Sequence, residues 1–238
     1  MKDSIEYAPR LKKLCNRLKR ETAATPKTDL IDPCTTIVLA CLSAVTTENK
    51  ARLGLSRLRH TFVDLNELRV SHFEEVADIL GKGFPHRKEI AQQIIGLLKD
   101  VYNAHDSLNL DDLREGSKRQ AKAFIESLED ANAYIVARVL LLSIGAHAIP
   151  VHQQMLQMLC KENVVPANAN EADVQGFLER QIPADQNRKI YALLRRQADS
   201  LRIKRTSETK DTAKSTKKAT KTTKTKNTKR TKTKKNSK

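Results

Sequence analysis

The sequence has no tryptophan, and only 4% of its 238 residues are aromatic. Glycine and proline are also scarce, with seven residues each, and strand-like alternation of apolar and polar residues is absent. These absences favour helices over strands. Hydrophobic residues still make up 39% of the chain. That is enough for a buried core and excludes a wholly disordered protein.

The sequence also lacks the marks of a secreted or membrane protein. Its four cysteines are irregularly spaced and no apolar leader precedes them, which argues against a disulfide scaffold. The longest apolar run, Ile135 to Ile149, is shorter than the roughly 18–20 residues of a membrane span and contains Arg138. We predict that it is a buried helix. We expect a soluble intracellular protein with no membrane partner, in the cytoplasm or nucleoid of a bacterium or in a nucleus.

Positive charge is concentrated at one end of the chain. The whole sequence carries 44 Lys+Arg against 28 Asp+Glu, a formal net charge of +16. Residues 204–238 alone hold 15 cations and two acids, a net of +13, so residues 1–203 carry only +3. The basic balance therefore belongs mainly to a tail.

The tail has no apolar residue larger than alanine, so we predict that residues 204–238 are disordered. It has no aromatic residue to stack on bases, which leaves sequence-independent neutralisation of phosphates. We favour nucleic-acid contact over a solubilising or targeting role. The candidate contacts are Lys217, Lys218, Lys221, Lys224, Lys226, Lys229 and Arg230.

Helical spacing of apolar residues recurs through residues 1–203 and predicts an all-α fold of about ten helices with short loops. Expected helices include 33–45, 48–60, 118–127, 132–145, 151–161, 171–181 and 187–202. Asp32 is expected to cap the helix that starts at Pro33, and Gly81 to end another. Pro85 is expected in the first turn of the next helix.

Three segments then share a pattern with a known family. Residues 32–47 (DPCTTIVLACLSAVTT) are similar to "DPF…L…LLSAQAT", and residues 128–152 are similar to "LPGVGRKTA…IAVDTH". Residues 83–90 (GFPHRKEI) resemble "G-(F/Y)-x-x-x-K-A-x-x-I". In order and spacing the three resemble the helix–hairpin–helix (HhH-GPD) DNA glycosylases, in the endonuclease III and adenine-mismatch glycosylase branch.

The resemblance implies two helical modules around a cleft that holds DNA, with a flipped base between them. Residues 30–146 would form a six-helix module with the hairpin. Residues 1–29 and 147–203 would form the second module, followed by the tail.

The hairpin departs from the family pattern. Its "GVG" positions, which bring backbone N–H groups to a phosphate, fall on Asp130, Ala131 and Asn132. Asp and Asn tolerate a left-handed backbone, so the turn can survive. We expect the Asp130 carboxylate to cap the following helix and to repel a phosphate, which would weaken DNA binding there. A plain N-cap is the alternative to any DNA contact.

Both catalytic positions implied by the resemblance are also substituted. The Schiff-base lysine falls on Tyr134, which cannot form an imine; some monofunctional glycosylases carry Tyr there. A packed Tyr134 with its hydroxyl at the cleft edge is an equal alternative. The catalytic aspartate falls on His152, which supplies no negative charge and, if protonated, would oppose an oxocarbenium-like transition state.

The sequence also bears on a residue that could enter the DNA base stack and on two kinds of metal site. The position of the intercalating glutamine falls on Val45, which we expect in the helical core rather than as an apolar wedge in DNA. The iron–sulfur motif C-x6-C-x2-C-x5-C is absent, so no such cofactor is expected. A zinc site at His147, His152 and Cys160 would lack a fourth ligand with suitable spacing. Other cysteines are expected to be buried.

Three functions fit these patterns. The preferred one is a DNA-binding protein on a glycosylase-like scaffold, catalytically impaired or inactive and related to base-excision repair. The second is an active, divergent monofunctional DNA glycosylase without β-lyase activity. The third is a general nucleic-acid-associated protein that binds through its tail while the body serves an unidentified protein partner.

Overall fold

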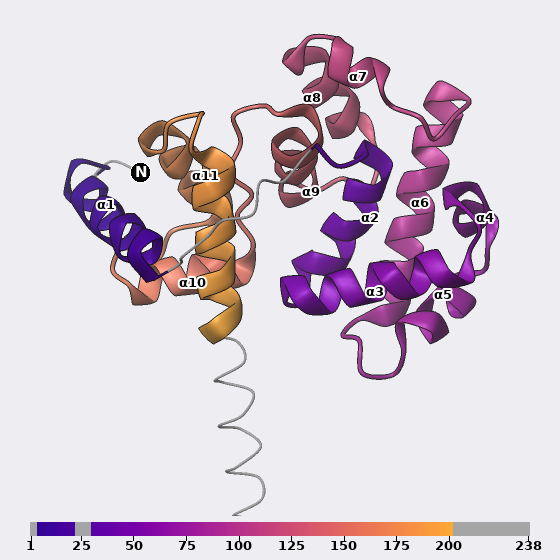
Figure 1. Cartoon of the computed structure of the whole chain (residues 1–238), viewed down its shortest axis with the longest axis horizontal. Coiled ribbons are helices and arrows are strands. Elements are labelled where there is room, and N and C mark those ends of the chain that lie inside the picture. The colour runs from indigo at the N-terminus through magenta and orange to yellow at the C-terminus, as the bar shows by residue number, and fades with distance from the viewer. Residues whose placement is uncertain (1–3, 22–29, 202–238) are drawn as a thin grey trace, which may run out of the picture. The chain divides into compact units, whose positions relative to one another are not determined.

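The computed structural model describes residues 4–21 and 30–201. Every regular element in this part of the chain is a helix, which confirms the predicted all-α class (Figure 1). The elements are α1 (Ser4–Glu21), α2 (Pro33–Ala44), α3 (Glu48–Thr61), α4 (Leu65–Val70), α5 (Phe73–Leu80), α6 (Arg87–His105), α7 (Asp112–Glu115), α8 (Lys118–Ser127), α9 (Ala133–Val139), η1 (Leu140–Ile144), α10 (Gln153–Lys161), α11 (Glu171–Gln181) and a last helix over 187–201.

Helix α2 is the central element of the core. All its residues from Pro33 to Ser43 are buried, and it packs against α3, α6 and α9 (Figure 1). Because α2 is buried on every side, its sequence lacks the polar face that a surface helix turns to water. The packing of α2 on α9 brings Ser43, near the end of α2, to Tyr134 at the start of α9.

Local signals place most helix ends where the sequence predicts them. The Asp32 carboxylate accepts a hydrogen bond from the Thr35 N–H at 2.7 Å, as an N-cap does, and Pro33 follows in the first turn. Gly81 ends α5 with φ of 87°, a backbone angle that favours glycine. Helices α8 and α11 match their predicted ranges residue for residue.

Two expectations need correction. Helix α6 begins at Arg87, so Pro85 lies in the preceding turn rather than in the first helical turn. His86 has a left-handed backbone, with φ of 49°, which does not fit inside an α-helix. The helix therefore begins at the next residue. The expected single helix over 132–145 is α9 followed by a π-helical segment, η1, which ends at Gly145 with φ of 69°.

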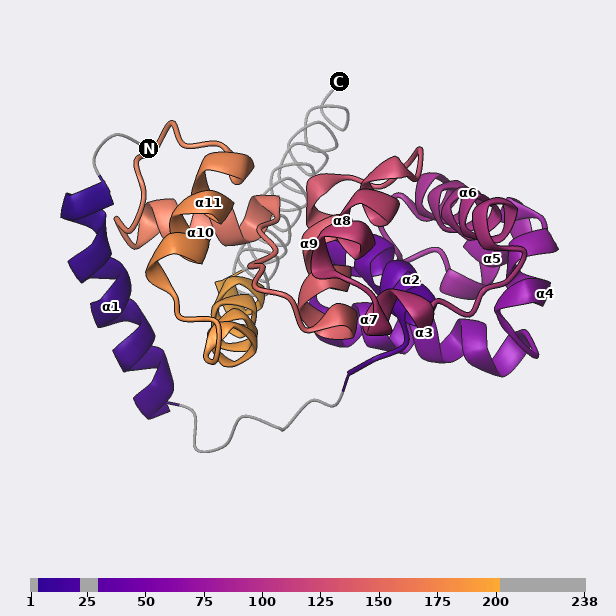
Figure 2. The same cartoon turned by 90° about the horizontal axis from the view of Figure 1, so that it is seen from above.

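A second group of elements forms around α10. This helix packs against α11 (Figure 2). The corner after α10 is tied to α1, because Arg17 forms an ion pair with Glu162 at 2.8 Å and Arg10 donates to the Asn163 carbonyl at 3.2 Å. Leu11, Leu14 and Leu18 of α1 are buried, at 2%, 4% and 4% exposure. Helix α1 therefore buries one face and exposes the other.

The remaining predictions concern the cysteines, membrane helices, the two modules and the tail. Cys15, Cys34 and Cys41 are buried, as expected. Among the described helices, none combines the length and apolarity needed to cross a membrane. The division into modules at 30–146 and at 1–29 with 147–203 stays a prediction, and the tail lies outside the described residues.

Candidate functional site around Tyr134 and His152

The structure brings together Tyr134 and His152, the two residues that the resemblance aligns with catalytic positions. Tyr134 lies in the first turn of α9, and His152 directly precedes α10. Their ring centroids are 5.4 Å apart, with the planes inclined at 46°. Both side chains are buried, at 5% and 3% exposure. Two residues that are 18 positions apart in sequence are therefore neighbours in the fold.

The hydroxyl of Tyr134 lies inside a polar network. It accepts hydrogen bonds from Nη1 of Arg138 at 3.0 Å and from Nη1 of Arg195 at 2.8 Å. Ser43 Oγ lies 3.0 Å from the same oxygen and donates to the Ala40 carbonyl at 3.1 Å. Tyr134 is therefore packed inside the fold, and both alternatives for its role stay predictions. Its hydroxyl is enclosed rather than placed at an exposed edge.

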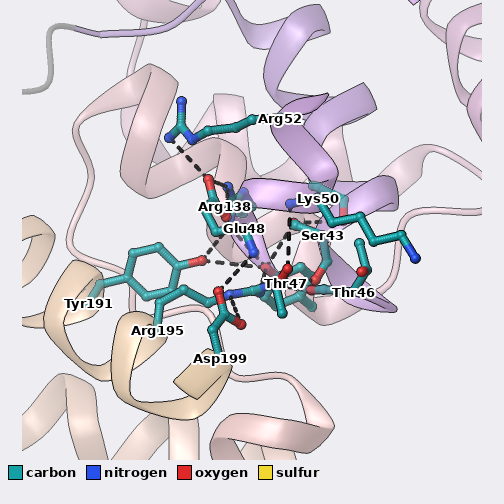
Figure 3. A network of polar contacts seen from close by, with 12 residues as sticks. Ser43, Thr46, Thr47, Glu48, Lys50, Arg52, Arg138, Tyr191, Arg195 and Asp199 are labelled. Atoms are coloured by element: carbon teal, nitrogen blue, oxygen red, sulfur yellow. Dashed lines mark hydrogen bonds and ion pairs between the residues drawn. The ribbon is translucent and has the colours of Figure 1, made fainter. Parts of the chain in front are cut away.

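Arg138 is fully buried and is held by Glu48, the first residue of α3 (Figure 3). Its Nη2 donates to both carboxylate oxygens of Glu48, each at 2.8 Å. Its Nη1 also donates to the Tyr191 hydroxyl. A buried guanidinium is tolerated only when it is paired and hydrogen-bonded, and Glu48 supplies the opposite charge.

Arg195 and Asp199, from the helix over 187–201, hold the connection between α2 and α3 (Figure 3). Arg195 pairs with Asp199 at 3.1 Å and donates through Nη2 to the backbone carbonyls of Ser43 and Thr46. The Asp199 carboxylate accepts the backbone N–H of Glu48 at 2.8 Å. The end of α2 and the start of α3 are therefore fixed by side chains from far along the chain.

Among the buried and half-buried members of this network the charges balance. Two guanidiniums, Arg138 and Arg195, face two carboxylates, Glu48 and Asp199. Burial alone would raise the pKa of the Glu48 carboxyl, but Arg138 and Arg195 outweigh it and lower this pKa below its usual value. Burial would likewise raise the pKa of Tyr134, and the same two guanidiniums lower it. The network therefore favours the ionised carboxylate of Glu48 and stabilises negative charge on the Tyr134 oxygen.

Glu48 has a further partner besides Arg138. Both oxygens of Glu48 accept Arg138, and one of them also lies 3.0 Å from Arg52. The Glu48 carboxylate therefore has two guanidinium partners.

The hairpin between α8 and α9 differs from the expectation in one respect. Asn132, not Asp130, caps α9: its Oδ1 accepts the Ile135 N–H at 3.0 Å. Asp130 is exposed and lies close to Gly96 of α6. A Cβ atom added to Gly96 would be 3.1 Å from Oδ2 of Asp130. Asn132 takes the cap because it directly precedes the first helical residue. The Asp130 carboxylate remains on the surface, where it would repel a phosphate; the DNA contacts at Asp130, Ala131 and Asn132 stay predictions.

Val45 is half-buried and forms the C-cap of α2, so it lies outside the fully buried core where the sequence placed it. The reason is that α2 ends at Ala44, and Val45 begins the connection to α3. A wedge role for Val45 in DNA stays a prediction.

Possible metal ligands are dispersed. His147 Nε2 contacts the Glu179 carbonyl at 2.7 Å, and Cys160 Sγ lies 3.5 Å from the Pro166 carbonyl. Within residues 4–21 and 30–201, no group of three His, Cys, Asp or Glu side chains could hold a metal ion. The expected absence of an iron–sulfur cluster stays a prediction.

Comparison with solved structures identifies the fold. The chain is similar to a trapped endonuclease III–DNA covalent intermediate, with a TM-score of 0.60 and 15% identity, over 82% of this chain and 84% of that one. It is similar to H. pylori 3-methyladenine DNA glycosylase, with a TM-score of 0.57 and 13% identity, over 83% and 94% of the two chains. The chain has the fold of the helix–hairpin–helix DNA glycosylases.

A third structure agrees: Clostridium acetobutylicum 8-oxoguanine glycosylase/lyase gives a TM-score of 0.62 and 12% identity, over 81% and 69% of the two chains. No protein-family model and no curated protein matches the sequence. The glycosylase fold is therefore present here with little sequence in common.

The sequence patterns did not indicate that Glu48, Tyr191, Arg195 and Asp199 belong to this network. One signal was available, because Arg138 stands alone in the apolar run of residues 135–149. An arginine in a buried helix requires an acidic partner. The sequence does not say which of 28 acidic residues supplies it.

Proposed function

We propose that this chain binds DNA through a glycosylase-like scaffold without releasing bases, and that it acts at damaged or distorted sites within base-excision repair. The observation that carries the proposal is the buried network of Tyr134, Arg138, Glu48 and Arg195. It occupies the place where the resemblance puts the catalytic groups.

The fold supports the DNA-binding half of the proposal. The similar structures include endonuclease III held covalently to DNA and an 8-oxoguanine glycosylase in complex with double-stranded DNA. The likeness extends over more than four-fifths of this chain. The similar arrangement of helices is consistent with DNA lying over the corresponding face of this chain, which supports this half of the proposal.

The chemistry of the site supports the inactive half. Base release passes through a sugar that gains positive charge, and catalysis requires negative charge placed beforehand where it develops. His152 offers none, and the Glu48 carboxylate is already bound by two guanidiniums. Tyr134 has no amine for a Schiff base, so neither route to bond cleavage is supported.

Burial supports the same conclusion. A catalytic group has to reach hydrogen-bond distance of the reacting atom. Tyr134 and His152 are 5% and 3% exposed, and the Tyr134 hydroxyl is surrounded by Ser43, Arg138 and Arg195. A flipped nucleotide would have to displace these buried groups to reach the Tyr134 hydroxyl.

A binding titration of the full chain tests the proposal. Two matched duplexes are compared at one moderate salt concentration, one intact and one with a central abasic-site analogue. A preference of tenfold or more for the abasic duplex, about 1.4 kcal/mol, is expected. Equal binding to both would mean that contact rests on charge alone, as in the tail-driven alternative. Release of a base from any duplex would favour the active monofunctional glycosylase instead.

A further inference from the structure

Helix α1 carries a concentrated positive charge that neither the network nor the hairpin uses. Its residues 4–21 contain six Lys or Arg and two Glu, a net charge of +4. Residues 1–203 total only +3, so the rest of this region is net −1. The excess positive charge of the folded region therefore comes from one helix.

The cations form a stripe on the exposed face of α1. Arg10, Lys13, Arg17 and Arg20 are all exposed and are spaced three, four and three residues apart. That spacing places them on one side of a helix, over an axial length of about 15 Å. Each strand of duplex DNA carries about one charge per 3.4 Å of axis, so the stripe is as long as about four phosphates of one strand.

The stripe borders a groove of about 940 Å³ between α1 and the corner after α10. Its lining holds five cations, the four of the stripe and Lys12, against Glu21 and Glu162. Arg17 is oriented toward this corner by its 2.8 Å ion pair with Glu162. No such ion pair joins Lys12, Lys13 or Arg20 to another residue of the described chain. The groove is therefore strongly positive and has cations available for an external anion.

We propose that the basic stripe of α1 and its groove form a second contact surface for the backbone of duplex DNA, separate from the hairpin and from the tail. The inference rests on the proposed DNA-binding function. A membrane surface fits less well, because an interfacial helix inserts its apolar face. In α1 that face is buried in the fold, with Leu11 and Leu14 at 2% and 4% exposure.

The test measures the salt dependence of DNA affinity in the full chain. One triple variant replaces Lys12, Lys13 and Arg20 by Gln. The control triple replaces Lys82, Lys99 and Lys118, three exposed lysines outside α1, by Gln and loses the same charge. Each phosphate contact contributes about 0.9 to the slope of log affinity against log salt, so the α1 variant should lose about 2–3 units and the control under about 1.

The remaining outcomes separate this inference from the proposed function. If the wild type prefers the abasic duplex but both triple variants lose equal slope, the stripe is not a contact surface and only this inference fails. If the α1 variant loses affinity for single-stranded RNA while its slope on duplex DNA is unchanged, the inference fails in favour of RNA. If the wild type does not bind DNA, both fail. Circular dichroism of each variant checks that all remain folded.

Discussion

Both carboxylate oxygens of Glu48 lie 2.8 Å from Nη2 of Arg138, a side chain with no exposed surface. The pair joins the start of α3 to α9 across 90 positions of sequence. It also shares Arg138 with the hydroxyls of Tyr134 and Tyr191. The site therefore combines a structural ion pair with the place where the resemblance puts a catalytic group.

Removing the buried guanidinium should destabilise the fold strongly. Arg138→Met leaves the Glu48 carboxylate without its partner, which costs about 3–5 kcal/mol for a buried pair. The control is Arg52→Gln. Arg52 also contacts Glu48 but is 53% exposed, and its loss should cost no more than about 1 kcal/mol. Urea unfolding measures both; equal losses would mean that the buried pair adds nothing beyond a surface pair.

Glu48 should also make stability depend on acid pH. Its pKa in the folded protein is lower than the ordinary value of 4.5, so the folded state holds the carboxylate ionised where the unfolded chain takes up a proton. The resulting stability is fully present above about pH 4.5 and is lost as pH falls through the folded pKa. Wild type should therefore lose more stability than Glu48→Gln between about pH 5 and pH 3. Parallel curves of unfolding free energy against pH would contradict this.

The hairpin should respond differently to two adjacent changes. Asn132→Ala removes the cap of α9 and should cost about 1 kcal/mol of stability. Asp130→Asn removes an exposed negative charge without removing the cap. It should leave stability nearly unchanged and raise DNA affinity, with the salt slope steeper by up to about 1 unit. If Asp130→Asn leaves affinity and slope unchanged, DNA does not approach this hairpin.

The tail makes a separate prediction. Deleting residues 204–238 removes 15 cations and should flatten the salt dependence of DNA affinity. Full engagement would lower the log–log slope by about 13 units, and partial contact by correspondingly less. A slope identical to that of the full chain would show that the tail does not touch DNA.

The fold could be predicted from the sequence more fully than the site could. Apolar spacing and cap residues are local, which explains why residues 118–127 and the Asp32 cap are predicted correctly. The two substituted positions, Tyr134 and His152, came from a resemblance rather than from spacing, and the structure puts their rings in contact.

The network could not be predicted because its pairings are distant. Arg195 bonds carbonyls about 150 positions earlier in the chain, at Ser43 and Thr46. Charged residues occur throughout the sequence, and no local pattern distinguishes Asp199 from an acid on a solvated helix face. Only the packing of the helix over 187–201 against the end of α2 selects these partners.

The most direct test of the central claim is a base-release assay with protein in excess over duplex, on a panel of mismatched, oxidised and alkylated bases. Wild type and His152→Asp are compared, since the variant restores the carboxylate that the resemblance calls for. We expect no release by either protein, because the site is buried and its charges are already paired, while the abasic duplex is still bound preferentially. Release by the wild type that His152→Ala abolishes would show a working glycosylase and contradict the account.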